Sequence, residues 1–409
     1  MREARDSDQH RLDKELNVSL SDRERANLEA IDQALRSLWD LGRYVFLLWS
    51  LRPGGIGVLR LPHEQLITFM IEHPEWVYWP TQRSPGGEHI SAEQFLMALM
   101  SGRRLVSDAA VNAAGKLLDA EICDIPVPHP LALQKGESAP VDALLRRFGM
   151  NFQSGRAVVL LDIVDFSLFR PLEQVTQIHS LSASLNWAHS RMQHRQIDVS
   201  FARSSTGDGF YIWNRDSGPR ANINLYHLMH LTLANNALQR RSAPPRSVPE
   251  VKTAFHIGSY YDIYLSEGLR PATDSVIVGT VTVELGRILG VARPGQILVG
   301  DFSVYPPEAE AAEAEAAVPM NSIAFIDAVQ PTLSELQGIE LLDDRLLNIR
   351  AYLTGRPLGG GVFDISRFKV IDKHQRSRIV YNAKVNIGAE RGRPVYLGLQ
   401  HHEVDLPEA

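Results

Sequence analysis

The stretch "ARSSTGDGFYIW", residues 202 to 213, joins a polar run to the bulky residues Phe210 to Trp213 through Gly207-Asp208-Gly209. An Asp-Gly pair between two strand-like runs is typical of a β-hairpin. The pattern therefore predicts two antiparallel strands with Asp208 at their turn. Asp208 has two explanations at this point: it makes the turn, or the turn presents its carboxylate.

Strands and helices alternate around this hairpin. The apolar run from Ala157 to Leu161 predicts a buried strand, and a helical stretch follows it. "NINLYHLMHLTLANNALQRR" predicts a second helix, and "VKTAFHIGSYYDIYL" and "QILVGD" predict further strands. This order predicts an α/β or α+β fold with a mixed sheet.

The first part of the chain has a different pattern. Residues 30 to 51 have helical periodicity, which "RPGGIGV" interrupts, and residues 62 to 120 contain further helical stretches. We expect a mostly helical regulatory or dimerisation domain over 1–145 and a second domain over 146–305. The segment 306–409 begins with Ala/Glu-rich sequence and continues with strands that we expect to complete the second domain.

Composition narrows the class of protein. The 409 residues carry a formal net charge of -6, which disfavours general binding to nucleic acid. The single cysteine, Cys123, excludes a disulfide framework and fits a reducing compartment. The N-terminus has no signal-peptide pattern, and the most apolar segment, residues 44 to 51, is too short to span a membrane. We therefore expect a soluble cytoplasmic protein.

Two carboxylates are placed where a metal site would need them. Asp162 closes the apolar strand, and Asp208 lies at the tip of the hairpin. Carboxylates at one edge of a sheet suit Mg²⁺ or Mn²⁺, which prefer oxygen ligands. The helix expected after Asp162 would offer free N–H groups to a triphosphate. A helix N-cap is the alternative role for Asp162.

The motifs "LLDIVDFS", "TGDGFYIW", "FHIG", "VELGRIL" and "GQILVGD" occur in this order over roughly residues 150 to 303. The ordered set resembles the catalytic domain of class III nucleotidyl cyclases, which include adenylate and guanylate cyclases. The resemblance implies an α+β ferredoxin-like core with a mixed, mostly antiparallel sheet and flanking helices. It also implies conversion of a nucleoside triphosphate to a 3′,5′-cyclic nucleotide and pyrophosphate, with two Mg²⁺ or Mn²⁺ ions per site and a homodimer that shares its active sites.

The resemblance also implies roles for individual residues. The resemblance implies metal binding by Asp162, Asp208 and Ile163, and transition-state stabilisation by Arg287 from the other chain. The positions implied for substrate binding are Val164, Asp165, Phe166, Ser167, Ser204, Val276 and Lys373, with Lys369 as the second candidate for the lysine.

The chain departs from the family at several positions. Ser204 replaces a lysine and Val276 replaces its partner acid, the pair that recognises a purine base. Asp165 replaces a usual glycine, and Val283 replaces an asparagine that precedes Arg287 by four residues. Two alternatives stay open: a pyrimidine cyclase, using UTP or CTP as some bacterial antiphage relatives do, and a cyclase-like module that binds a nucleotide without turnover.

Overall fold

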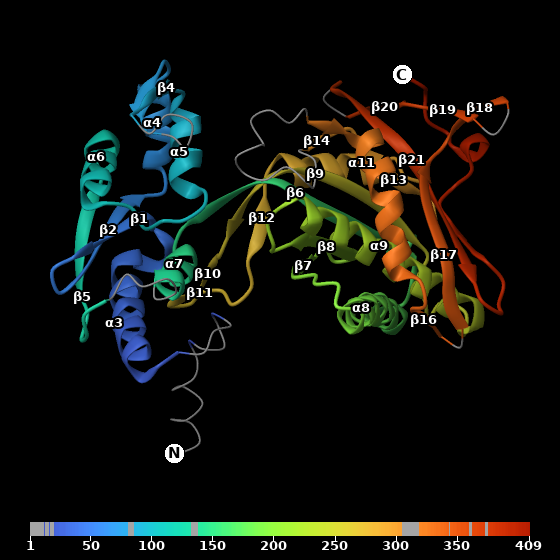
Figure 1. Ribbon diagram of the computed structural model, residues 1–409, viewed down its shortest axis with the longest axis horizontal. Coiled ribbons are helices and arrows are strands. Elements are labelled where there is room, and N and C mark those ends of the chain that lie inside the picture. Colours follow the sequence, from blue (N-terminus) through green and yellow to red (C-terminus); the bar gives the residue numbers. More distant parts are fainter. Residues whose placement is uncertain are drawn as a thin grey trace. The chain divides into compact units, whose positions relative to one another are not determined.

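The computed structural model describes residues 12, 16, 20–80, 86–131, 138–304, 319–342, 344–359, 362–372 and 375–409. The chain forms two compact units (Figure 1). The first comprises residues 1–153 and 261–278, and the second comprises residues 154–260 and 279–409. Of the described helices, none has the length and apolar character needed to cross a membrane.

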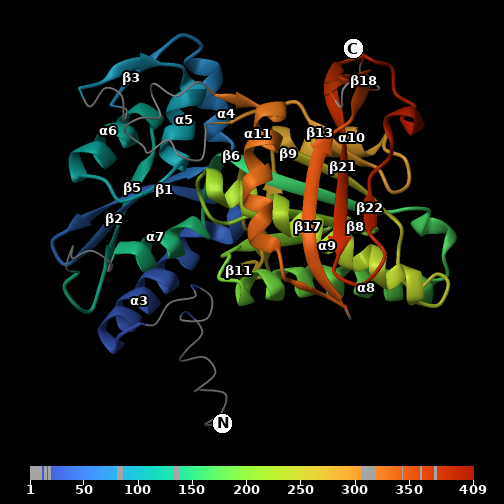
Figure 2. The ribbon, with the colours of Figure 1, turned by 45° about the vertical axis from the view of Figure 1, so that its right-hand side comes forward.

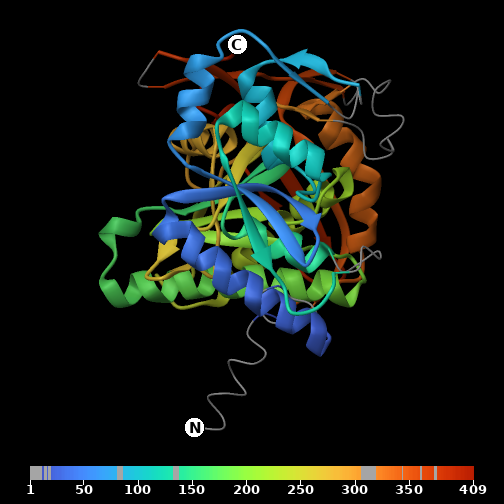
Figure 3. The same cartoon turned by 90° about the vertical axis from the view of Figure 1, so that its left-hand side faces the viewer.

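The first unit is built around a three-stranded antiparallel sheet of order β1-β2-β5, which the blue and teal strands of Figure 3 show. Its elements are α3 (Asp22–Trp39), η1 (Asp40–Gly42), β1 (Tyr44–Arg52), β2 (Gly55–Pro62), α4 (Gln65–Glu72), β3 (Val77–Trp79), β4 (Glu88–Ile90), α5 (Ala92–Met100), α6 (Asp108–Leu118), β5 (Glu121–Pro126) and α7 (Ser138–Arg146). The short strands β10 (Ser266–Glu267), β11 (Arg270–Pro271) and β12 (Val276–Val278) also belong to it.

This sheet was not predicted, and the single helix expected over residues 30 to 51 is wrong. The helix ends at Trp39, and Gly42 follows with φ 97°. The next residues, "YVFLLWSLR", form β1, which is mostly buried. β-Branched and aromatic residues in a short apolar run suit a buried strand, and apolar periodicity alone does not distinguish such a strand from a helix.

The second unit contains a mixed, mostly antiparallel sheet, as expected. Its main strand order is β16-β17-β21-β13-β9-β6-β8-β7, in which β13 and β9 are parallel. The strands are β6 (Met150–Ile163), β7 (Phe201–Ser205), β8 (Gly209–Asn214), β9 (Val251–Ile263), β13 (Ile297–Gly300), β16 (Glu340–Leu341), β17 (Asp344–Leu353), β20 (Phe368–Ile371), β21 (Ser377–Ala389) and β22 (Val395–Leu397). Figure 2 shows the long strands β17 and β21, which pair along their length.

The remaining elements of the second unit are helices and short strands outside this sheet. They are η2 (Phe166–Leu168), α8 (Pro171–His194), α9 (Pro219–Ser242), α10 (Thr280–Leu289), β14 (Ser303–Val304), β15 (Met320–Asn321), α11 (Ser322–Val329), η3 (Gln330–Leu336), β18 (Gly355–Gly359), β19 (Val362–Ile365) and η4 (His401–Glu403).

Strand β6 is buried on both faces from Ala157 to Leu161, which explains the continuous apolar sequence there. Ala157, Val159 and Leu161 belong to a core that includes residues of α8 and α9. Val158 and Leu160, which point to the other face, are also almost fully buried. Burial on both sides fixes the strand firmly in the middle of the sheet, so the residues at its end are held in place.

Candidate active site

Asp162 and Asp208 lie together at one edge of the sheet. β6 and β8 pair antiparallel with Asp162 opposite Gly209, the residue that follows Asp208. The amide of Ile163 donates a hydrogen bond of 2.9 Å to the carbonyl oxygen of Asp208. This register places the two carboxyl groups beside each other.

Gly207 and Gly209 of the hairpin are each required for a different structural reason. Gly207 takes φ 98°, whereas Asp208 does not adopt a positive φ, so the backbone of the turn needs glycine at 207 only. A Cβ atom on Gly209 would lie 1.9 Å from the carbonyl oxygen of Leu161. Gly209 therefore allows the close approach of β8 to β6 that brings Asp208 to Asp162. The carboxylate of Asp208 accepts a hydrogen bond of 3.1 Å from the hydroxyl of Thr206 within the turn, and it also lies beside the carboxyl group of Asp162.

The carboxyl group of Asp162 titrates abnormally. Burial, and then the charge of Asp208, raise the pKa of Asp162 to about 6, while the charge of Lys252 opposes that rise. The ammonium of Lys252 lies 3.8 Å from a carboxylate oxygen of Asp162. Two neighbouring acids favour a divalent cation between them, because it would relieve their mutual repulsion.

Lys252 was not singled out from the sequence. It lies on β9, and β9 is the neighbour of β6 in the sheet. Lys252 is partly exposed, whereas its neighbours Val251 and Thr253 are buried. A lysine within a strand of this kind is only a weak indication of a functional residue. The sequence does not specify which strands are neighbours, so nothing in it connects Lys252 to Asp162.

The segment after Asp162 was expected to turn and then enter a helix. α8 follows at Pro171, with Arg170 as its N-cap. The turn at Asp165, where φ is 56°, and the short helix η2 come first. The N-cap role considered for Asp162 is therefore not observed. The left-handed backbone at Asp165 explains why glycine suits this position in the family, and aspartate tolerates it better than most residues.

The main chain of this segment has free donors. The amide of Val164 donates to the carbonyl oxygen of Glu250 and is therefore occupied. Among the described residues, no acceptor is found for the amides of Asp165, Phe166 and Ser167. Successive free amides next to a residue in the left-handed region form a concave site that suits an anion. This part of the chain could hold phosphate oxygens.

Arg287 is held by acids of its own chain. Its guanidinium lies 3.2 Å from Asp372 and 3.8 Å from Glu284. Arg378 contacts the same two acids, and the side chain of Asp372 is only 5% exposed. No contact of Arg287 with Asp162 or Asp208 is found, so the described residues of one chain do not bring it to the carboxylate pair.

Ser204 and Val276, the positions expected to recognise the base, lie on different strands. Ser204 lies on β7 opposite Tyr211, whose hydroxyl donates to the carbonyl oxygen of Thr282 at 3.1 Å. Burial raises the pKa of Tyr211. Val276 lies on β12 in the first unit, and Val283 on α10 is 47% exposed.

Lys373 lies outside the described residues, as does the Ala/Glu-rich segment 306–317. Lys369, the second candidate, lies on β20, and its amide donates to the carbonyl oxygen of Pro407. Among the described residues, no cluster of three or more His, Cys, Asp or Glu side chains suited to a metal ion is found. A metal ion at this edge would therefore depend on the two aspartates, with main-chain, water or substrate oxygens completing its ligands.

Comparison with known proteins finds likeness in structure only. No family model and no curated protein matches the chain. The similar solved structures include the guanylyl cyclase Cya2, with 12% identity, a TM-score of 0.31, and coverage of 57% of this chain and 92% of that chain. The adenylyl cyclase CyaB from P. aeruginosa has 11% identity and a TM-score of 0.33, with 59% and 97% covered.

A guanylate cyclase domain from Catenaria anguillulae, in complex with GTP, has 10% identity and a TM-score of 0.34, with 58% of this chain and 98% of that chain covered. The likeness to cyclase catalytic domains that the motifs indicate is thus found among solved structures. At these identities and TM-scores the likeness does not indicate an activity.

Proposed function

We propose that this chain is a metal-dependent nucleotidyl cyclase, which converts a nucleoside triphosphate to a 3′,5′-cyclic nucleotide and pyrophosphate. The observation that carries the proposal is the pairing of β6 with β8, which places the carboxyl group of Asp162 beside that of Asp208 at the ends of the strands. Burial, and then the charge of Asp208, raise the pKa of Asp162 to about 6. A core strand and a hairpin with a glycine at the contact point hold this pair together. Without a ligand, repulsion between the two carboxylates destabilises the folded protein, and a divalent cation would remove that repulsion.

The residues fit Mg²⁺ or Mn²⁺. Both cations take oxygen ligands, and Mg²⁺ is usually bound by one or two carboxylates together with waters and substrate phosphates. When bound, such ions stabilise negative charge on phosphoryl oxygens and lower the pKa of a coordinated hydroxyl group. In the proposal Asp162 and Asp208 hold the cations, and the amides of Asp165 to Ser167 donate to the triphosphate.

A second copy of the chain completes the proposed site. Arg287 is bound to Asp372 and Glu284 and does not contact the carboxylate pair of its own chain. In the proposed homodimer each Arg287 serves the site of the partner. The first unit has the regulatory or dimerising role in this proposal.

The second candidate is a module that binds a nucleotide without turnover. Val283 is the observation that favours it. This exposed residue lies on α10 four residues before Arg287, and its apolar side chain cannot form a hydrogen bond. Ser204 bears on the substrate, since a hydroxyl in place of a lysine suits a pyrimidine triphosphate such as UTP or CTP.

One experiment separates these candidates. The purified protein is incubated with ATP, GTP, CTP or UTP and Mn²⁺, and cyclic products are sought by mass spectrometry. We expect product from at least one triphosphate, and none from Asp162→Asn or Asp208→Asn. Asp198→Asn is the matched control, since this exposed residue precedes the same hairpin. Nucleotide binding without product from any triphosphate would support the binding module and reject the cyclase.

A further inference from the structure

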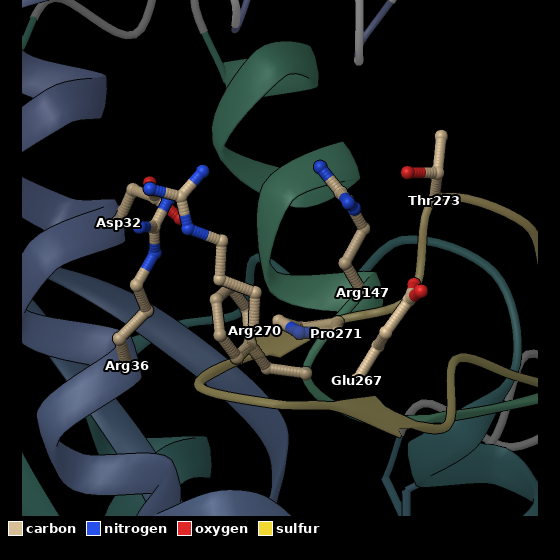
Figure 4. Close-up of a pocket in the computed structure, with 8 residues that line it drawn as sticks. Asp32, Arg36, Arg147, Glu267, Arg270, Pro271 and Thr273 are labelled. Atoms are coloured by element: carbon tan, nitrogen blue, oxygen red, sulfur yellow. The ribbon is translucent and has the colours of Figure 1, made fainter.

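A cavity of about 240 Å³ lies within the first unit, and its lining is rich in arginine. Figure 4 shows the side chains that surround it. Asp32 and Arg36 come from α3, Arg147 follows α7, and Glu267 and Arg270 come from the β10–β11 hairpin. The cavity is thus assembled from three segments that are distant in sequence.

The charge of the lining favours an anion. The cavity is lined by three arginines, Arg36, Arg147 and Arg270, and by two acids, Asp32 and Glu267. One positive charge therefore remains after these charges are summed. Arginine is the side chain that most often recognises phosphate and carboxylate groups, because its planar fork offers several donors at once.

Two of these arginines have unused donors. Arg36 binds Asp32 through one terminal nitrogen, while its Nε is buried and has no hydrogen-bond partner. Arg270 is exposed at the end of its hairpin, and no described residue forms a hydrogen bond or ion pair with its side chain. A buried donor without a partner is uncommon in folded proteins and often marks the place of an absent ion or water.

We propose that this cavity binds a small ligand that carries a phosphate group. Donors that approach from three segments suit a tetrahedral oxyanion, whose oxygens point in several directions, better than a planar carboxylate with two oxygens. The volume exceeds the needs of a single phosphate ion, so a phosphomonoester or diphosphate also fits. Glu267 lowers the affinity, because its carboxylate lies in the same lining.

The ligand would fasten the hairpin to the rest of the first unit. Arg270 lies on β11, whereas Arg36 and Arg147 belong to the N-terminal part of the chain. An oxyanion that accepts from both groups would reduce opening of residues 265–273. This inference is independent of the proposed cyclase activity, because it requires neither nucleotide nor a divalent cation.

Binding is tested by calorimetry on the full-length protein in EDTA, with inorganic phosphate, pyrophosphate and ribose 5-phosphate as separate probes. We expect saturable binding of at least one probe. Arg270→Gln should weaken it about ten-fold, the value of one charge-assisted hydrogen bond, and Glu267→Gln should strengthen it several-fold. Arg43→Gln, on another exposed arginine of the same unit, is the matched control and should leave binding unchanged.

Hydrogen exchange gives an independent measurement. With the best probe, residues 265–273 should gain protection in the parent protein and not in Arg270→Gln. Arg36→Gln should also lose binding, and its melting temperature shows whether it is folded. Absence of binding by any probe would overturn the proposal. Binding that survives Arg270→Gln but is lost in Asp208→Asn would also overturn it, because the anion would then lie at the carboxylate edge.

Discussion

Replacement of Asp208 by asparagine tests whether the carboxylate pair is a cation site. The substitution keeps the size and most hydrogen-bonding capacity of the side chain but removes its charge. In the parent protein without metal, burial and the charge of Asp208 both raise the pKa of Asp162, from 3.8 to about 6. The folded state therefore binds the Asp162 proton more tightly than the unfolded state does. Stability accordingly falls as pH rises from about 4 to about 6, and the cost persists above that range.

The magnitude follows from the size of the shift. One pKa unit corresponds to about 1.4 kcal/mol, so the full shift would amount to about 3 kcal/mol. Asp162 is partly exposed, and screening by solvent reduces this figure to roughly 1 to 1.5 kcal/mol. Burial is the largest cause and Asp208 the second. Asp208→Asn should therefore stabilise the metal-free protein by about 0.5 kcal/mol at pH 7.5, or about 1–2 °C in melting temperature.

Thermal melting with and without Mn²⁺ is the assay. In EDTA at pH 7.5 the variant should melt above the parent protein, and at pH 4 the difference should shrink. With millimolar Mn²⁺ the parent should gain stability and the variant should not, so the order of the two melting temperatures reverses. Asp198→Asn should respond to Mn²⁺ as the parent does. A variant that melts lower in EDTA, or that gains as much from Mn²⁺ as the parent, would refute the reasoning.

Three further substitutions test other parts of the structure. Lys252→Met should raise the pKa of Asp162 further. Mn²⁺ should therefore bind more weakly at pH 6 and equally or more tightly at pH 8, and equal changes in affinity at both pH values would contradict the ion pair. Gly209→Ala should destabilise the protein by more than about 2 kcal/mol in urea unfolding, because its Cβ would lie 1.9 Å from the Leu161 carbonyl oxygen, and a neutral result would contradict the close strand contact. Arg287→Ala and Asp208→Asn chains should each be inactive alone, but an equal mixture should recover about a quarter of the parent activity if dimers form at random and share their sites. Half of the dimers then contain both variants, and each of these has one intact site of two. A mixture that exchanges chains but stays inactive would reject shared sites.

The sequence predicted most of what depends on local pattern in the second unit. The hairpin around Asp208 and the strand that ends at Asp162 both appear where they were expected. The apolar alternation of a strand and the chemistry of a turn are short-range signals, so they are readable without knowledge of neighbours. The position of Asp162 at the strand end follows from the same signals.

Features that depend on long-range packing were not predictable. α9 has an expected apolar face, yet the structure buries it on all sides from Asn222 to Asn236, including His227 and His230. Burial lowers the pKa of both histidines to about 3. The hydroxyl oxygen of Thr332 on η3 lies 3.1 Å from Nε2 of His227. These residues are far apart in sequence, so no helical pattern reveals this contact. Lys252 was missed for the same reason.

The segment Tyr261–Val278 has a consequence for how this protein can be dissected or rearranged. The chain passes from one unit to the other at 153/154, at 260/261 and again at 278/279. The first two passages lie inside the continuous strands β6 and β9 instead of in loops. A single protease cut between the units would leave them covalently joined, and a fragment ending at residue 153 would lack the strands β10 to β12. Recombination that transplants one unit onto another protein would have to move two separate pieces of the gene together. The two units are therefore expected to be inherited as a pair.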